Sequence, residues 1–201
     1  MATDIVRATH SLNAVDVESG YRDCMFPMAE PGSRVVTWHR PKRRAVLPFD
    51  RFHISRSLAR VLKQHRYEAT FDRAFAGVMD ACADREDSTW ISAGFKTVYG
   101  ELHTQGKAHS VEVWVEGELA GGLYGVHLGG AFFAESKFHR RTNMSKVALA
   151  ELVFRLRERG FALLEVQYLT PHLAQFGVVE IPDGEYQRLL KTALASPCSF
   201  D

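Results

Sequence analysis

The sequence of 201 residues predicts a mixed α/β fold that consists of one main domain and a small N-terminal part. Two observations support this prediction. Apolar residues recur with a helical period between residues 55 and 106, and from Ser110 onward they alternate with polar residues, as they do in strands. A helical segment over residues 145–160 then leads directly into an apolar strand, which is typical of a parallel or mixed sheet covered by helices.

The first fifty residues carry weaker signals. Residues 1–20 show little periodicity, so we expect a loosely ordered start to the chain. A short apolar strand is expected at residues 35–38, after a turn at residues 30–33. Pro41 and Pro48 bracket a basic run, and we expect this segment to be an ordered connection to the rest of the chain.

Five helices are expected after this connection. The first has Ser55 or Ser57 as its N-cap, and a second begins near Thr70 and buries a stripe of apolar side chains. A third spans residues 92–106, the fourth is the helix over residues 145–160, and the last begins after residue 182.

Three strands are expected at residues 111–115, 119–126 and 131–136. Glycines at positions 121, 122 and 125 fall inside the second of these strands. Glycine within a strand indicates a β-bulge, or the close approach of a ligand or another backbone.

The strand expected at residues 162–169 is the most informative segment of the chain. Because side chains alternate along a strand, Glu165 and Gln167 are expected to project side by side from one face. Burying a carboxylate beside a carboxamide is unfavourable unless both are hydrogen-bonded, so we expect a polar partner there. The alternative is a sheet edge that faces water.

Charge is distributed unevenly along the chain, although the net charge is only +1. Between positions 34 and 66 there are ten Lys or Arg residues and one acid, Asp50. Phosphate binding depends on the local density of basic residues, so this segment indicates contact with a polyanion, with a solvated surface as the alternative. Arg56, Arg60 and Lys63 recur at helical spacing and are expected to share one helix face.

Composition argues against several classes of protein. No apolar run has the length of a membrane-spanning helix, and the N-terminus lacks the plan of a secretory signal. Three scattered cysteines indicate reduced thiols in a cytoplasmic protein. No histidines have the spacing of a metal-binding motif, so no metal is expected. No apolar helix stripe is left without a place in the core, so we expect a monomer.

Many short segments together resemble the bacterial leucyl/phenylalanyl-tRNA–protein transferase family. They occur in the family's order and with its spacing from about residue 21 to residue 190. The matching segments are Tyr21, Phe26–Pro27, His53–Ser57, Thr89–Ser92, Tyr99–His103, Gly106–Glu112, Gly121–Gly125, Phe133–Ser136, Ser145–Leu149, Thr170–Leu173 and Phe176–Pro182.

The resemblance implies an acyl-CoA N-acyltransferase-like mixed sheet flanked by helices. It places a small N-terminal domain at residues 1–44 and the aminoacyl-transferase domain at residues 45–201. It also implies an activity: transfer of Leu or Phe from its tRNA to the N-terminal Arg or Lys of an acceptor protein, which marks that protein for degradation. No CoA would be used. The one formal match to a pyrophosphate loop, at residues 157–162, lies at a helix-to-strand junction, where backbone amides do not point at a phosphate.

The family pattern also implies roles for individual residues. Gln167 would orient the attacking amine, Glu165 would attract the ammonium and help to remove its proton, and Glu135 would suit a cationic acceptor. The pocket for the donor amino acid would be formed by Leu123, Phe132, Lys137, Leu149, Leu152 and Leu164. Aromatic residues Trp90, Tyr99 and Tyr21 would lie at the tRNA 3′ adenosine and the site, and the basic helix with Arg56, Arg60 and Lys63 would hold the acceptor stem. Periodicity alone would place the apolar and aromatic residues in the core.

Three positions depart from the family pattern. Glu165 replaces the usual Asp, Lys137 replaces a Met of the pocket, and Met28 replaces a Trp. These differences leave three alternatives to the Leu/Phe transfer: the same reaction with another donor or acceptor, a tRNA-binding module without catalysis, and a CoA-dependent acetyltransferase.

Overall fold

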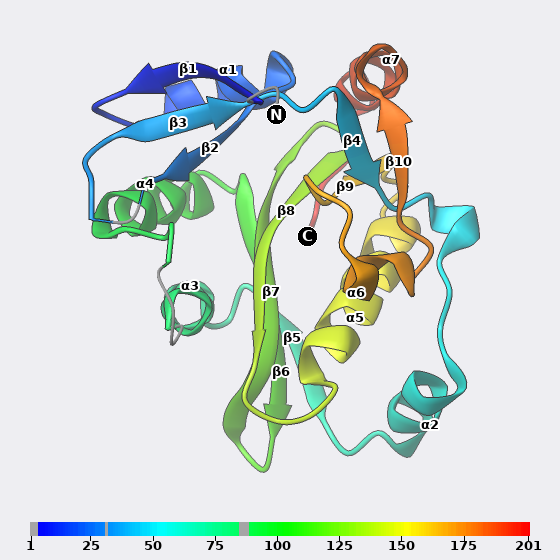
Figure 1. Cartoon of the computed structure of the whole chain (residues 1–201). Helices are drawn as coiled ribbons and strands as arrows, with labels where there is room; N and C mark the ends of the chain where they lie inside the picture. The colour runs from blue at the N-terminus through cyan, green and yellow to red at the C-terminus, as the bar shows by residue number, and fades with distance from the viewer. Residues whose placement is uncertain (1–3, 31, 85–88) are drawn as a thin grey trace.

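The structure is a computed structural model that describes residues 4–30, 32–84 and 89–201. Figure 1 shows the arrangement of the elements. In chain order they are β1 Ile5–Thr9, α1 Ala14–Arg22, β2 Phe26–Ala29, β3 Val36–His39, β4 Arg43–Val46, the 3-10 turn η1 Phe49–Arg51, α2 Arg56–Gln64, β5 Glu68–Phe71, α3 Phe75–Ala83, α4 Ala93–Thr104, β6 Ala108–Val115, β7 Glu118–Leu128, β8 Ala131–His139, α5 Met144–Glu158, β9 Leu163–Glu165, α6 Pro171–Ala174, β10 Val179–Pro182 and α7 Asp183–Leu194.

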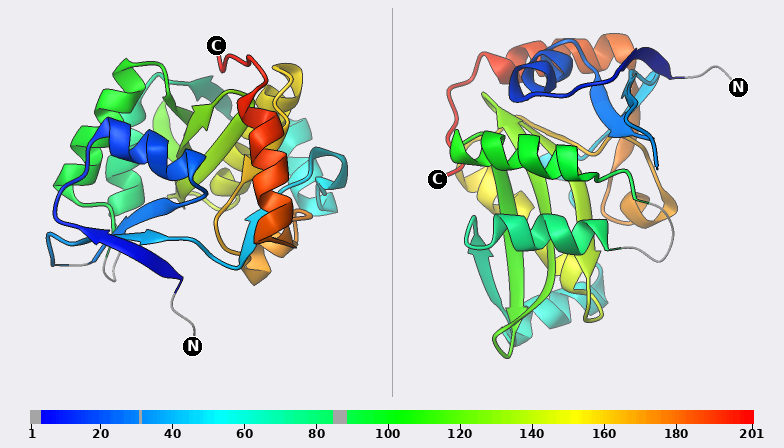
Figure 2. Two further views of the ribbon diagram at one scale, coloured as in Figure 1. Left: turned by 90° about the horizontal axis from the view of Figure 1, so that it is seen from above. Right: turned by 90° about the vertical axis from the view of Figure 1, so that its left-hand side faces the viewer.

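A seven-stranded mixed sheet forms the centre of the molecule, with the strand order β10-β4-β9-β8-β7-β6-β5. Only β8 and β9 pair in parallel, and every other neighbouring pair of this sheet is antiparallel. Helices α3 and α4 cover one face and α5 covers the other (Figures 1 and 2). The prediction of a mixed α/β sheet flanked by helices is therefore confirmed.

The described part of residues 1–20, from residue 4 onward, contains a strand and a helix, so the expectation of a loosely ordered start was wrong there; residues 1–3 lie outside the described residues. Strands β1, β3 and β2 form a three-stranded antiparallel sheet, and α1 packs beside it against α4. Trp38 in β3 is fully buried, and Gly20 of α1 lets the helix lie directly on its indole ring. The core of this small unit depends on single large side chains such as Trp38 rather than on a repeated apolar stripe. Its sequence therefore shows little periodicity.

The predicted connection between Pro41 and Pro48 is instead strand β4, which lies between β10 and β9 in the large sheet. The sequence places Arg43 and Arg44 at the end of the N-terminal part. In the structure both residues lie in a strand of the large sheet. This strand was not predicted because its first two residues are basic, although Ala45 and Val46 are buried.

The second predicted helix begins later than expected. Thr70 lies in β5 rather than at a helix cap, and α3 begins only at Phe75. Asp72 has a positive φ of 59°, which ends the strand before the helix starts. Thr70 pairs with Glu112 on the neighbouring strand β6, and its hydroxyl donates to Glu112 Oε2 at 2.6 Å.

Other helix boundaries agree with the sequence. The side chains of Ser55 and Ser92 accept hydrogen bonds from the third amide after each of them, as N-caps do. Helix α5 begins one residue before the predicted Ser145, and it approaches β7 closely, because a Cβ on Gly121 would lie 2.7 Å from the Met144 carbonyl carbon. None of the described helices is both long and apolar enough to cross a membrane.

Candidate active site

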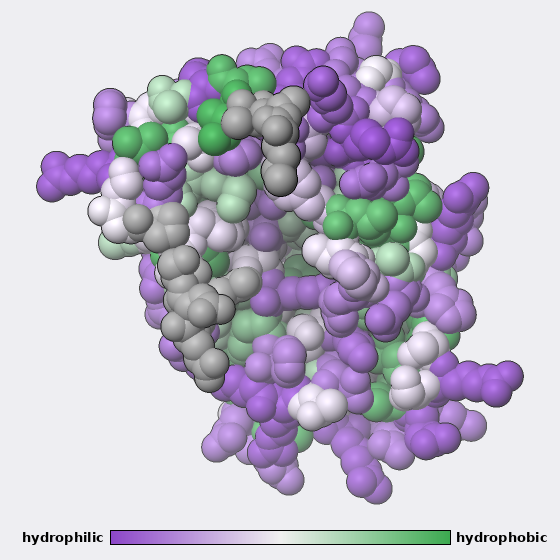
Figure 3. Space-filling model, viewed as in Figure 1, coloured by the Kyte–Doolittle hydropathy of each residue, from purple (hydrophilic) through white to green (hydrophobic). Residues whose placement is uncertain are grey.

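A pocket opens where β8 and the chain after β9 separate. The two strands pair only as far as Phe133 and Glu165, and β8 continues while the other chain turns away. The inner part has a volume of about 90 Å³ and is lined by Leu123, Ala134, Glu135, Ser136, Lys137, Leu149, Val166 and Leu173. A wider opening of about 630 Å³ shares several of these residues and adds Trp90, His139, Ser145, Gln167, Tyr168, Thr170 and His172. Figure 3 shows a hollow near the centre of this face.

A β-bulge directs Glu135 into this pocket. Tyr124 pairs with Ser136 and Gly125 pairs with Ala134, so Glu135 is the extra residue between them. Bulges of this kind re-aim side chains and are common beside functional sites. The predicted significance of the glycines in this strand is thus confirmed for Gly125. Glu135 is 8% exposed, and its Oε1 makes no hydrogen bond with any described residue.

Gln167 reaches the pocket by a different route from the one its sequence pattern predicts. Strand β9 ends at Glu165, and Gln167 has a positive φ of 65°. Its backbone amide donates to Glu165 Oε1 at 2.6 Å, and its side-chain Nε2 donates to Glu135 Oε2 at 3.1 Å. The expectation of a regular strand with the two side chains side by side was therefore wrong, but both residues do have polar partners.

Glu165 is completely buried and is paired with a buried arginine. Arg44 Nε lies 2.8 Å from Glu165 Oε1, and the two side chains are 1% and 0% exposed. Glu165 does not line either part of the pocket. The alternative of a water-facing sheet edge is excluded for Glu165.

Burial shifts the pKa of both carboxyl groups. It raises the pKa of Glu165, while Arg44 and the Gln167 amide oppose this rise. Burial and the charge of Glu165 raise the pKa of Glu135 well above its ordinary value, and the hydrogen bond from Gln167 opposes them. Glu135 is thus the carboxyl group that lies in the pocket and has a pKa well above its ordinary value.

Lys137 is an unusual residue in an otherwise apolar inner pocket. Its Nζ is buried and makes no hydrogen bond with any described residue. The amine lies 5.8 Å from the centre of the Phe176 ring. Burial, together with the nearby charge of Lys146, lowers the pKa of Lys137 to about 8.

The predicted donor-pocket residues separate into two groups. Leu123, Lys137 and Leu149 line the inner pocket. Phe132, Leu152 and Leu164 lie in the same apolar cluster but do not line the described pocket, and Phe132 stacks on Phe200 instead. Ala134, Val166 and Leu173 also line the inner pocket, although none of them was predicted as a donor-pocket residue.

The predicted aromatic residues also occupy different places. Trp90 lines the wider opening. Tyr21 and Tyr99 are fully buried, with their hydroxyl oxygens 3.5 Å apart, and Tyr21 stacks on Phe133 with ring centres 4.1 Å apart. Burial also raises the pKa of Tyr99. These two tyrosines therefore support the β8 wall from behind, as periodicity alone had suggested.

The predicted basic face lies on α2, which packs on α5. Arg56, Arg60 and Lys63 are all exposed, and no ion pair joins them to a described residue. Figure 1 shows α2 at the end of the molecule where the β6–β7 hairpin turns.

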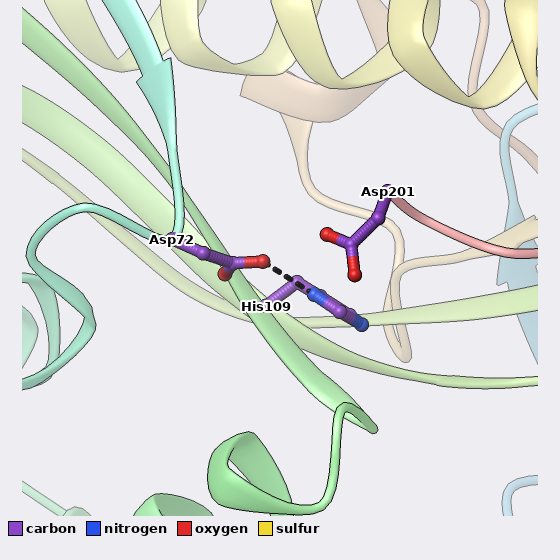
Figure 4. A group of neighbouring side chains, drawn as sticks. All are labelled: Asp72, His109 and Asp201. Carbon is purple, nitrogen blue, oxygen red and sulfur yellow. Dashed lines mark hydrogen bonds and ion pairs between the residues drawn. The ribbon is translucent and has the colours of Figure 1, made fainter.

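A second polar cluster lies away from the pocket, at the start of β6 (Figure 4). Asp72, His109 and Asp201 bring their ligand atoms within 4.8 Å of one another. Asp72 already accepts hydrogen bonds from His109 Nδ1 at 2.6 Å and from the Ser110 amide at 2.8 Å. These contacts account for the cluster without an ion, and the expectation of no metal stays a prediction.

Sequence reasoning missed the residue that holds Glu165. Arg44 lay within a basic run whose expected role was binding a polyanion, and nothing in its spacing distinguishes it from Lys42 or Arg43. Its position next to buried Ala45 and Val46 was the only signal available.

Comparison with known proteins identifies the family of this chain. The model of the family described as leucyl/phenylalanyl-tRNA protein transferase matches residues 46–191. Proteins named leucyl/phenylalanyl-tRNA–protein transferase are similar along most of their length. The protein of Ruegeria pomeroyi is 53% identical over 90% of this chain and 86% of its own, and that of Gloeobacter violaceus is 52% identical over 90% and 93%.

Among solved structures, L-PGS from Bacillus licheniformis has a similar fold, with a TM-score of 0.50 and 11% identity over 76% of this chain and 65% of its own. This likeness concerns the fold alone. The matched segment contains Glu135, Glu165 and Gln167, and the relatives cover the chain beyond it. The chain belongs to the leucyl/phenylalanyl-tRNA protein transferase family.

Proposed function

We propose that this protein transfers Leu or Phe from an aminoacyl-tRNA to the N-terminal Arg or Lys of acceptor proteins, and so marks those proteins for degradation in the cytoplasm. The observation that carries the proposal is the convergence of Glu135 and Gln167 on the wider opening of one pocket in a chain of this family. The aminoacyl-tRNA is a co-substrate, and neither CoA nor a metal takes part. The protein acts as a monomer.

The chemistry requires little beyond positioning and proton removal. The donor is an ester that is already activated, and the acceptor α-amine has an ordinary pKa near 8. The amine nitrogen attacks the ester carbonyl carbon, a new C–N bond forms, and the C–O bond to the tRNA ribose breaks. The proton lost by the amine finally neutralises the ribose oxygen. Alignment of two such groups alone can supply a large part of the rate.

Glu135 is the residue best suited to receive the acceptor. Its Oε1 has no hydrogen-bond partner among the described residues, so it is available to a cationic N-terminus or to an Arg or Lys side chain. Because burial raises its pKa, Glu135 in its ionised form is a stronger base toward the proton of the amine than an exposed carboxylate.

Gln167 then positions the attacking amine. Its side-chain amide is fixed by a hydrogen bond to Glu135, and its backbone amide is fixed by a hydrogen bond to Glu165. The role of Glu165 changes accordingly: it supports Gln167 from inside the protein and does not touch the amine.

A transfer assay tests the proposal. A peptide with N-terminal Arg is incubated with several labelled aminoacyl-tRNAs and either the wild-type protein or Gln167→Ala. We expect transfer of Leu and Phe, with a fall of about 100-fold in the variant, the size expected when a reacting group is misplaced by about 1 Å. Binding of tRNA without transfer of any residue would support a non-catalytic binding module. A requirement for acetyl-CoA would support an acetyltransferase.

One observation favours a second candidate, which is the same reaction with another donor. The Lys137 amine in the inner pocket has no hydrogen-bond acceptor among the described residues. A donor side chain that carries an oxygen would satisfy it, whereas Leu and Phe would not. Preferential transfer of such a residue, and its reversal to Leu in Lys137→Met, would replace the first candidate by the second.

A further inference from the structure

Arg44 connects the pocket with two distant parts of the chain. It lies in β4, and its guanidinium carbon is 4.7 Å from the ring centre of Phe26 in β2 and 4.7 Å from that of Tyr186 in α7. Its Nε forms the ion pair with Glu165. Arg44 is only 1% exposed and lines no described pocket, so it cannot touch a substrate.

The strand that carries Arg44 also holds the backbone of the turn. The Ala45 amide donates to the Gln167 carbonyl oxygen at 3.2 Å, and the Val166 amide donates to the Ala45 carbonyl oxygen at 3.0 Å. The turn is thus fixed from β4 through its main chain and, by way of Arg44 and Glu165, through a side chain as well.

This second support is needed because the turn is unfavourable by itself. A left-handed backbone conformation disfavours a residue with a Cβ by about 1–2 kcal/mol. The hydrogen bond from the Gln167 amide to Glu165 offsets this loss, and it is strongest when Glu165 is ionised. A buried carboxylate without a countercharge would take up a proton instead.

We propose that Arg44 is a positioning residue for aminoacyl transfer, because its buried guanidinium keeps Glu165 oriented and ionised so that Glu165 holds the turn that presents the Gln167 amide to Glu135. The inference rests on the proposed function. It assigns the geometry of the pocket to a chain of contacts from Arg44 through Glu165 and Gln167 to Glu135.

The surroundings of Glu165 define what removal of Arg44 does. Arg44 reaches it from β4, Glu135 acts on it from β8, and the phenol groups of Tyr186 and Tyr168 act from α7 and from the chain after β9. Arg44 is the only cation among these groups. Without Arg44, Glu165 keeps the hydrogen bond from the Gln167 amide but loses its countercharge, so it holds its proton to a higher pH.

The test measures kcat, KM for tRNA and the pH profile of Arg44→Met. We expect kcat at pH 7 to fall about 10- to 100-fold while KM changes less than about threefold. Activity should recover as the pH rises and Glu165 loses its proton, and Arg44→Lys should restore part of kcat at pH 7. Arg40→Met is the matched control, since it removes a half-exposed ion pair with Asp183 in the same region and should leave kcat unchanged.

A double variant keeps the test decisive if Arg44→Met does not fold. Arg44→Met/Glu165→Gln removes both charges and leaves no unpaired buried ion. We expect it to fold, with a reduced kcat and without the recovery at high pH. Wild-type kcat in the double variant, or a loss confined to KM in Arg44→Met, would overturn the proposal.

Hydrogen exchange at the Gln167 amide provides a readout that does not depend on activity. We expect faster exchange in Arg44→Met or in the double variant than in Arg40→Met. Unchanged protection overturns the positioning role even if the wild-type protein transfers amino acids. Lack of transfer by the wild-type protein refutes the proposed function, and the exchange result then shows whether Arg44 nevertheless holds the turn.

Discussion

Replacing Lys137 by methionine should stabilise the protein. The pKa of Lys137 falls from its ordinary 10.5 to about 8, and a fall of this size corresponds to about 3 kcal/mol of weakened preference for the charged amine in the folded state. The variant also loses the cation–π contact with Phe176, which reduces the expected gain in stability by about 0.5–1 kcal/mol. Methionine fills a similar space without a charge, so Lys137→Met should raise the free energy of unfolding by about 2 kcal/mol at pH 7.

The sign of this effect predicts its pH dependence. Because the folded pKa lies below the unfolded one, the charged amine weakens the fold at every pH below about 8, and the effect disappears as the pH rises toward 10.5. The assay is urea unfolding of wild type and variant between pH 6 and pH 10.5. Lys63→Met, at an exposed lysine, should change stability by less than about 0.5 kcal/mol throughout. Equal destabilisation by Lys137→Met at every pH would refute the reasoning and reveal a favourable partner for the amine.

Three further predictions concern the fold and the RNA. Gly177→Ala should cost about 1–3 kcal/mol of stability, because Gly177 has φ +89° and a Cβ would collide with the Arg51 carbonyl oxygen. Gly184→Ala serves as the control, since a Cβ there meets nothing within 4 Å. Equal unfolding midpoints for the two variants would contradict this prediction. The free energy of unfolding should fall as the pH drops from 6.5 to about 4, since burial lowers the pKa of His127 to about 4 and the unfolded chain takes up its proton first; His127→Asn should flatten that part of the curve, and an unchanged slope would exclude His127 as its cause. Replacing Arg56, Arg60 and Lys63 by Gln should reduce the slope of log affinity for tRNA against log salt by about 2–3 if each contacts a phosphate, and an unchanged slope would place the RNA elsewhere.

The sequence predicts the large elements of this fold well because their apolar patterns are long. Helix α5 and strands β6 to β8 each bury many residues at regular spacing, and their positions agree with the prediction. Strand β3 of the N-terminal sheet agrees with the strand expected at residues 35–38, but β1, β2 and β4 were missed. Their burial depends on single large side chains such as Trp38 and Arg44, and a pattern cannot reveal which basic residue of a run is turned inward.

Some residues that line the candidate pocket were marked from the sequence, but the geometry of the pocket was not predicted. Glu165 and Gln167 were marked as a polar pair on an apolar strand, and of these two only Gln167 lines the pocket. Alternation along a regular strand placed them side by side, whereas the left-handed conformation of Gln167 sends one inward and the other to the pocket. The intrinsic preference of glutamine is against that conformation, and contacts with β4 impose it instead. The sequence pattern alone therefore could not predict it. The bulge at Glu135 was likewise suggested by glycine on the neighbouring strand, but its exact position depends on strand register.

The most direct test of the whole account is mass spectrometry of a peptide with N-terminal Arg after incubation with the protein and Leu-tRNA, without CoA. We expect one added leucyl residue on the peptide's α-amine, formed by wild type and by Arg40→Met but strongly reduced in Gln167→Ala and Arg44→Met. An unmodified peptide in the presence of bound Leu-tRNA, or leucine attached to a side chain instead of the α-amine, would contradict it.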